Sequence, residues 1–241
     1  NREGWEYILN SHGGKLPIVI KAVEEGTVVP INNVLMTIEN TDNKCFWLTN
    51  FLETILSQVW YPITVASLSR EVKVNIKEYL DLTSDGGLLN FGLHDFGFRG
   101  ASSWESAGIG GAAHLINFLG TDTVVAMEVA VNYYNANLDN LAFSVAATEH
   151  SVMTALGKNG EEQVVENLLN EYPTGILSVV SDSYDIYNFV DYIVGQKFRD
   201  RIKNRKGVFV VRPDSITPTH PTPEAEMVWI INTLWDHFGG T

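Results

Sequence analysis

The alternation of apolar and polar residues at the start of the chain predicts one helix followed by a small β-rich layer. Trp5, Ile8 and Leu9 recur at the spacing of one helix face, and a Gly-Gly pair after them ends the pattern. Segments 16–23 and 34–38 are rich in β-branched residues and are separated by turn-forming residues. We therefore expect two short strands to follow the helix.

Two longer helical patterns come next, and beyond Gly86 the character of the chain changes. Apolar residues at helical spacing predict helices at 45–59 and 67–82. The elements expected after them are a strand at 88–93, a helix from a Ser102/Glu105 capping box to Phe118, a segment at 123–134, a strand at 176–180 with a helix at 184–194, and a strand at 208–211 with a helix at 223–238. This alternation is typical of a parallel α/β fold.

Two parallel architectures compete for the second part of the chain. A dinucleotide-binding fold receives little support, because no Gly-x-Gly-x-x-Gly follows a strand, and the glycine cluster at 108–111 lies within a helical pattern, where close helix packing explains small residues. In a (β/α) barrel, active-site residues gather at the carboxyl ends of the strands, and the polar clusters fall at those places. A complete barrel takes roughly 250 residues. The part of the chain after Gly86 is much shorter, so we expect an incomplete barrel. The expected domains are a β-rich layer with connecting helices at 1–84 and a partial barrel at 85–241.

Composition and charge narrow the function classes. The chain of 241 residues has a net charge of −13, which disfavours a nucleic-acid partner. The single cysteine, Cys45, is expected to be a buried thiol in a reducing compartment. Without a membrane-length apolar run or a signal pattern, we expect a soluble, cytoplasmic protein. The cationic run at 197–206 is interpreted as a solvated helix face, and the start at Asn1 as an internal or processed end.

Several side chains at the predicted strand ends suit chemistry on a phosphorylated sugar. Such chemistry uses cations for phosphates, carboxylates for hydroxyls or Mg²⁺, and a flat apolar surface for a ring. The candidates are Phe96, Arg99, His150, Asp182, Arg212 and Asp214. Each has an ordinary alternative, since Asp182 could cap a helix, Asp214 could serve a turn and His150 could be a hydrogen-bonded helix residue. Their joint placement favours a site.

Five separated motifs, in order along the chain, resemble the nicotinamide phosphoribosyltransferases. They are His94-Asp95-Phe96-Gly97-Phe98-Arg99-Gly100, Gly120-Thr121-Asp122-Thr123, Glu149-His150-Ser151, Ser181-Asp182-Ser183-Tyr184-Asp185-Ile186-Tyr187-Asn188 and Arg212-Pro213-Asp214-Ser215. Earlier stretches at 16–40, 47–50 and 60–66 are also similar to that family. The resemblance implies a type II phosphoribosyltransferase fold, a homodimer with shared active sites, and formation of nicotinamide mononucleotide and pyrophosphate from nicotinamide and phosphoribosyl pyrophosphate with Mg²⁺.

The resemblance also implies roles for residues that bind the base. Phe96 would stack on the pyridine ring, and Arg99 and Arg212 would lie near the base and phosphate. Asp122 would accept a hydrogen bond from the carboxamide and would repel the carboxylate of nicotinate, although a helix N-cap is its ordinary alternative. Ser178 is placed with the substrate-binding residues.

Further residues would serve the ribose and a coupled step with ATP. Asp182 and Asp214 resemble carboxylates near the ribose, where negative charge favours an oxocarbenium-like transition state. His150 resembles the histidine that the family phosphorylates with ATP, and Ser144 and Val145 would line the same pocket. No protein ligand for a metal is expected.

The chain departs from the family pattern in four respects. No proline follows Val145, the residues after Ser215 differ, and the Gly-rich phosphate loop and an N-terminal aromatic segment are not within the chain. We therefore expect weak binding by this chain alone.

Three alternatives to the leading interpretation stay open. The first is a non-catalytic or partner-dependent subunit of the same fold. The second is a nicotinate-preferring relative, which Asp122 argues against. The third is a metal-dependent barrel hydrolase, which the lack of a His-x-His pair after the first barrel strand disfavours.

Overall fold

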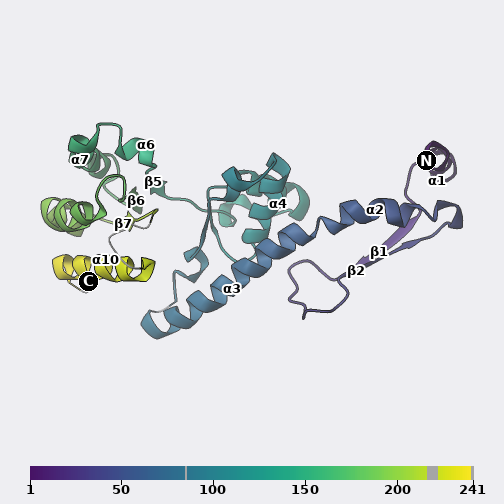
Figure 1. Cartoon of the computed structure of the whole chain (residues 1–241), viewed down its shortest axis with the longest axis horizontal. Helices are drawn as coiled ribbons and strands as arrows, with labels where there is room; N and C mark the ends of the chain where they lie inside the picture. Colours follow the sequence, from purple (N-terminus) through teal and green to yellow (C-terminus); the bar gives the residue numbers. More distant parts are fainter. Residues whose placement is uncertain (85, 216–221, 240–241) are drawn as a thin grey trace. The chain divides into compact units, whose positions relative to one another are not determined.

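The computed structural model describes residues 1–84, 86–215 and 222–239. These residues form two compact units, Asn1–Ser144 and Val145–Thr241 (Figure 1). Each unit contains its own helices and strands, so each is described by itself. The division into 1–84 and 85–241 that the sequence indicates stays a prediction.

The first unit opens with helix α1 (Arg2–His12) and a two-stranded antiparallel sheet, as the apolar pattern predicted. Asn1 caps the start of α1, and Gly13 ends it in the left-handed conformation with φ of 60°. Strand β1 (Ile18–Ala22) pairs with β2 (Met36–Asn40). A 3₁₀ turn, η1 (Asn43–Cys45), then leads to α2 (Leu48–Ser57). Cys45 is fully buried, as expected, in a small core with Ile8 and Leu48.

The long helix α3 (Trp60–Thr83) begins well before residue 67, where the apolar pattern placed its start. Pro62 falls in its first turn, where backbone N–H groups have no partner within the helix and proline is tolerated. Figure 1 shows α3 as a continuous rod against which α4 (Trp104–His114) packs. The connection from α3 to α4 holds the first polar strand end of the molecule.

That connection corrects two expectations. Residues 88–93 do not form a strand: η2 (Leu89–Phe91) is a 3₁₀ turn, and only β3 (His94–Asp95) is extended. A short apolar run fits a helix turn as well as a strand, and here Gly92 closes the turn by donating to Leu89 O. Helix α4 is capped by Ser103, whose hydroxyl accepts from Ser106 N, and not by the Ser102/Glu105 pair.

The remaining elements of the first unit surround α4. They are η3 (Gly97–Gly100), β4 (Gly120–Thr121), α5 (Val125–Tyr134) and η4 (Leu138–Asn140). Strands β3 and β4 are parallel. The glycines of α4 allow close packing, as expected, because a β carbon on Gly108 would lie 2.7 Å from Val129 Cγ2 and one on Gly111 would lie 2.6 Å from Ala126 Cβ.

The second unit is built on a parallel three-stranded sheet in the order β5-β6-β7. Its elements are β5 (Ala146–Ala147), α6 (His150–Met153), η5 (Lys158–Gly160), α7 (Glu161–Glu171), β6 (Leu177–Val180), α8 (Ile186–Asn188), the π-helix η6 (Phe189–Lys197), α9 (Arg199–Lys203), β7 (Phe209–Arg212) and α10 (Pro223–Phe238). The apolar core lies between β6 and the helices α7 and η6. The expected strands at 176–180 and 208–211 and the helix at 223–238 are confirmed.

The structure confirms the α/β class of the chain. Its described sheets contain two, two and three strands, so a closed barrel is not seen among these residues. None of the described helices is both long and apolar enough to cross a membrane.

Candidate functional site

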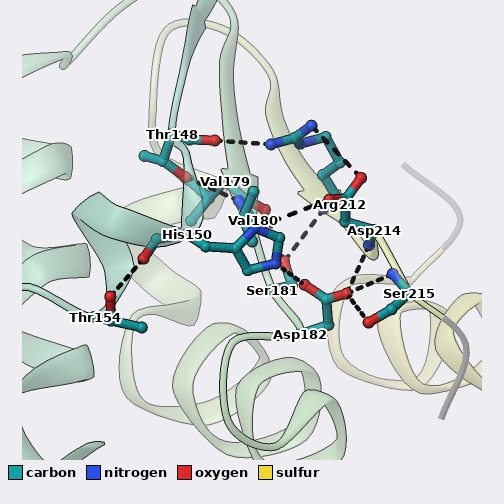
Figure 2. Close-up of polar contacts among 10 residues, drawn as sticks. All are labelled: Thr148, His150, Thr154, Val179, Val180, Ser181, Asp182, Arg212, Asp214 and Ser215. Carbon is teal, nitrogen blue, oxygen red and sulfur yellow. Dashed lines mark hydrogen bonds and ion pairs between the residues drawn. The ribbon is translucent and has the colours of Figure 1, made fainter. Parts of the chain in front are cut away.

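The carboxyl ends of β5, β6 and β7 bring together one group of the predicted site residues. Parallel strands end at the same edge of their sheet, so the side chains that follow them become neighbours. Figure 2 shows His150, Asp182, Arg212 and Asp214 converging at this edge. The sequence predicted this gathering, and in the second unit the structure contains it.

Asp182 is the centre of this group. Its side chain is 1% exposed, and Oδ1 lies 3.1 Å from His150 Nε2. Oδ2 accepts from Asp214 N at 2.9 Å, Ser215 N at 2.5 Å and Ser215 Oγ at 2.6 Å. Burial would raise the pKa of Asp182, but these hydrogen bonds outweigh it and the pKa is lowered. The helix-cap alternative is wrong, because Asp185 caps α8.

His150 lies between two carboxylates at the start of α6. Its Nε2 faces Asp182, and its Nδ1 lies 3.8 Å from Asp214 Oδ2. The side chain is 43% exposed, so one edge of the ring can meet a ligand. A proton on Nε2, donated to Asp182, leaves the Nδ1 lone pair available as an acceptor or nucleophile.

Arg212 ends β7 and is held partly buried beside Asp214. Its Nη2 donates to Thr148 O at 2.8 Å, and Nη1 lies 4.0 Å from Asp214 Oδ1. Its backbone N–H donates to Ser181 Oγ, which itself donates to Val179 O. These contacts fix the direction of the guanidinium group at the strand end.

Two other predicted residues of this unit lie on or beside the sheet. Ser178 is 8% exposed on β6, and its carbonyl accepts from Thr148 N at 2.9 Å. Val145 precedes β5 and is 41% exposed. Ser178 therefore supports the strand that leads to His150, and Val145 has an open apolar side chain.

A second group of predicted residues lies in the first unit, where β3 and β4 end. Asp122 follows β4, and its backbone N–H donates to Asp95 O at 2.9 Å. Asp122 Oδ1 accepts a short hydrogen bond from Ser144 Oγ. The same oxygen lies 3.2 Å from His94 Nε2, which is not aligned for a hydrogen bond, so the two attract each other only when the imidazole is protonated. Asp122 does not cap α5, whose first turn receives no side-chain cap.

Phe96 and Arg99 follow β3, the strand that pairs with the one before Asp122. The Phe96 ring is 47% exposed, and its centroid is 4.6 Å from that of His94 with a tilt of 38°. Arg99 lies in η3, three residues after Phe96. His94 thus contacts both the exposed Phe96 ring and the Asp122 carboxylate, and an aromatic face and a carboxylate at one site suit a flat ring that carries a hydrogen-bond donor.

The site residues thus fall into two groups, one in each unit. Ser144 contacts Asp122 in the first unit, while Val145 and His150 belong to the second, so a pocket shared by all three stays a prediction. His94 was noted at the strand end but not selected as a site residue. Its contact with Asp122 comes from tertiary packing, and its place two residues before Phe96, at the start of the first family-like motif, was the available signal.

Comparison with known proteins agrees with this geometry. The profile of the "Nicotinate phosphoribosyltransferase (NAPRTase) family" matches residues 91–241. Proteins named nicotinamide phosphoribosyltransferase are similar over 90% of this chain in Xanthomonas campestris pv. campestris (48% identity) and over 95% in Acinetobacter baylyi (36% identity). The matched part covers 47% and 48% of those relatives, so the chain spans about half their length. The chain belongs to the nicotinate phosphoribosyltransferase family.

Proposed function

We propose that the protein containing this chain transfers the phosphoribosyl group of phosphoribosyl pyrophosphate to nicotinamide. The products are nicotinamide mononucleotide and pyrophosphate, which places the reaction in NAD biosynthesis. The observation that carries the proposal is the exposed Phe96 ring and the Asp122 carboxylate, both in contact with His94, in a chain 48% identical to a nicotinamide phosphoribosyltransferase.

The residues of the first unit would bind the base. Phe96 would stack on the pyridine ring, which contributes about 0.5–1.5 kcal/mol beyond simple burial. Asp122 would accept a hydrogen bond from the carboxamide N–H, and Ser144 restrains one of its oxygens for that purpose. The carboxylate of nicotinate would be repelled from the same place. Arg99 would contact the base or a phosphate.

The residues of the second unit would act on the sugar and phosphates. As the bond from the anomeric carbon to pyrophosphate breaks, positive charge develops on the ribose, and the Asp182 and Asp214 carboxylates would stabilise it. Arg212 would bind phosphate from its restrained position at the end of β7. Val145 and Ser178 would line the pocket.

Mg²⁺ would enter with phosphoribosyl pyrophosphate. Asp182 is a poor ligand for it, because both carboxylate oxygens already accept hydrogen bonds. Asp214 is a better one, with a side chain 52% exposed. The cation would neutralise charge on the pyrophosphate.

His150 would be the residue phosphorylated by ATP. Its Nδ1 would attack the γ-phosphorus of ATP, forming an N–P bond as ADP leaves with the electrons of the broken P–O bond. Asp182 would stabilise the ring by accepting from Nε2. We expect His150→Ala to abolish an acid-labile, base-stable phosphate label from ATP, while Asp200→Asn, at an exposed position, retains it.

The rest of the architecture is part of the same proposal. The remaining half of the protein would complete a type II phosphoribosyltransferase barrel, and two copies would share active sites as a homodimer in the cytoplasm. Exposed aromatic residues in the first unit support this, since Phe46 is 75% and Trp60 62% exposed. Large apolar side chains in contact with solvent are typical of surfaces that other protein segments cover.

The experiment is formation of nicotinamide mononucleotide and pyrophosphate by the whole protein with nicotinamide, phosphoribosyl pyrophosphate and Mg²⁺. We expect Asp182→Asn to lower kcat by about 100-fold or more, as for loss of an electrostatic transition-state contact. Asp200→Asn is the matched control. A folded whole protein that forms no product would contradict the proposal and favour a non-catalytic subunit.

A further inference from the structure

A cluster of polar side chains in the N-terminal unit has no part in the proposed reaction. Tyr7 and His12 lie on α1, Asp42 lies at the start of η1 and Cys45 at its end. The sequence separation hides the cluster, because the β1–β2 hairpin lies between α1 and η1 along the chain. The cluster therefore joins the first helix of the unit to the turn that precedes α2.

The donor atoms are close enough to share one ion. His12 Nε2 lies 2.8 Å from Asp42 Oδ2, and a nitrogen, a carboxylate oxygen and the Cys45 sulfur all lie within 4.8 Å of one another. Zinc bonds of about 2.0–2.3 Å in a tetrahedron place two ligands roughly 3.5 Å apart. Small side-chain movements would bring the three atoms to that spacing.

Hydrogen bonds hold Asp42 in place, and part of the cluster is exposed to solvent. Asp42 Oδ1 accepts from Lys44 N at 2.8 Å, which leaves Oδ2 facing His12. Tyr7 OH also donates to Oδ2, at 2.8 Å. The side chains of His12 and Asp42 are 30% and 21% exposed, whereas Cys45 is fully buried. An ion could therefore reach the His12 and Asp42 side chains from solvent.

The protonation states fit a site that releases a proton on binding. The hydrogen bond from Lys44 N, with those from His12 and Tyr7, lowers the pKa of Asp42, so its carboxylate is charged at neutral pH. Burial and the neighbouring Asp42 charge raise the pKa of the Cys45 thiol. Without an ion the sulfur keeps its proton, and a divalent cation would displace it.

We propose that His12, Asp42 and Cys45 form a Zn²⁺ site that fastens α1 to η1. The mixed nitrogen, oxygen and sulfur donors suit a cation of intermediate softness, and Zn²⁺ accepts all three in tetrahedral sites. Water or the Tyr7 hydroxyl completes the coordination. On binding, the Cys45 S–H proton leaves to solvent and the sulfur donates its electron pair to the metal, while the His12 proton moves to Nδ1 so that Nε2 can coordinate.

The competing explanation is a hydrogen-bonded cap that never binds metal. In that case His12 and Tyr7 only serve Asp42, and Cys45 is an apolar core residue next to them. The two explanations differ in the role of the sulfur. A thiolate bound to metal has an optical signature that a buried thiol lacks.

The test is titration of the full chain with Co²⁺ under reducing conditions, followed by displacement with Zn²⁺. We expect a near-ultraviolet thiolate-to-cobalt charge-transfer band that saturates with one ion and disappears on adding Zn²⁺. Cys45→Ser should remove the band, His12→Gln should weaken binding at least tenfold, and His237→Gln, in the other unit, should change neither. Zn²⁺ should also raise Tm of the wild-type chain but not of Cys45→Ser.

Proton release gives a second measurement that does not depend on the variants. One proton per Zn²⁺ should enter an unbuffered solution, because the thiol must lose its proton to bind the metal. A folded wild-type chain that shows no thiolate band would overturn the proposal. So would a band of equal strength in Cys45→Ser.

Discussion

At the scale of single residues, the second unit treats two buried carboxyl groups in opposite ways. Asp182 accepts hydrogen bonds from Ser215, Asp214 and His150, and its pKa is lowered despite burial. Glu161, at the start of α7, is 4% exposed, and its Oε1 has no hydrogen-bond partner. Burial, with the nearby charge of Asp185, raises the pKa of Glu161 to about 7. Both groups are buried, so the opposite directions of their pKa shifts come from the hydrogen bonds that Asp182 accepts and that Glu161 Oε1 lacks.

Glu161 predicts a pH dependence of stability. Its folded pKa of about 7 lies above the ordinary value of 4.5, so the folded state holds the proton more tightly. The stability that protonated Glu161 contributes to the folded state is present below about pH 4.5 and is lost as pH rises through 7. We expect Glu161→Gln to raise the free energy of unfolding at pH 8 by roughly 1–2 kcal/mol and to flatten its decline between pH 5 and 8.

Urea unfolding of the second unit's signal at several pH values would measure this effect. Glu171→Gln, at the exposed end of the same helix, is the matched control and should leave the profile unchanged. If Glu161→Gln kept the wild-type pH profile, Glu161 would not titrate in this range.

At the scale of elements, close backbone packing positions the first strand ends. Gly111 of α4 lies against Ala126 of α5, and a β carbon there would also lie 3.3 Å from Asp95 Oδ2. Asp95 Oδ2 in turn accepts from Thr121 Oγ1, and the Asp95 carbonyl accepts from the backbone N–H of Asp122. The close packing of α4 on α5 therefore affects the position of Asp122, through Asp95.

We expect Gly111→Ala to destabilise the first unit by about 1–3 kcal/mol, as overpacking does in a close-packed contact. The reason is that Ala126 Cβ, only 2.6 Å from the new atom, has no flexible end to move. Gly100→Ala is the control, since a β carbon there meets nothing within 4 Å. Thermal unfolding of both variants measures the difference, and equal Tm values would refute the packing argument.

One residue of the cationic run in the second unit also connects two segments of the fold. The sequence interpreted residues 197–206 as a solvated face, yet Arg205 donates to Tyr172 O, Thr174 O, Gly175 O and Val208 O. Its planar guanidinium group thus holds the loop before β6 against the turn before β7. The surface interpretation is right for Lys203, which is exposed, and wrong for Arg205, which is half-buried.

Arg205→Lys should therefore destabilise the second unit, because an ammonium group cannot bind several carbonyls in one plane. The expected loss is about 1–2 kcal/mol, from several hydrogen bonds to carbonyl oxygens that each contribute roughly 0.5–1.5 kcal/mol. Lys203→Arg, the reverse exchange at an exposed site, should have little effect. Urea unfolding checks both, and an Arg205→Lys variant as stable as wild type would mean that the carbonyls find water instead.

At the scale of the whole molecule, local sequence signals predicted individual helices and strands. The expected strand ends predicted the group of site residues in the second unit. Helix α10 was predicted with its observed bounds, because Thr222 caps it, Pro223 starts it and Gly239 ends it. His150 and Asp182 meet because parallel strands end together. The contact of His94 with Asp122 and the meeting of Tyr7 with Asp42 depend on tertiary packing, which no spacing in the sequence encodes.

The central claim is that this family member uses Asp122 to select nicotinamide. The most direct measurement is kcat/KM of the whole protein for nicotinamide and for nicotinate, in the wild type and in Asp122→Asn. Removing the charge while keeping the shape should reduce the preference for nicotinamide by about 10–100-fold, as for loss of one charged hydrogen bond. Asp139→Asn, exposed in the same unit, should keep the wild-type ratio. An unchanged ratio in Asp122→Asn, or a wild type that prefers nicotinate, would contradict the account.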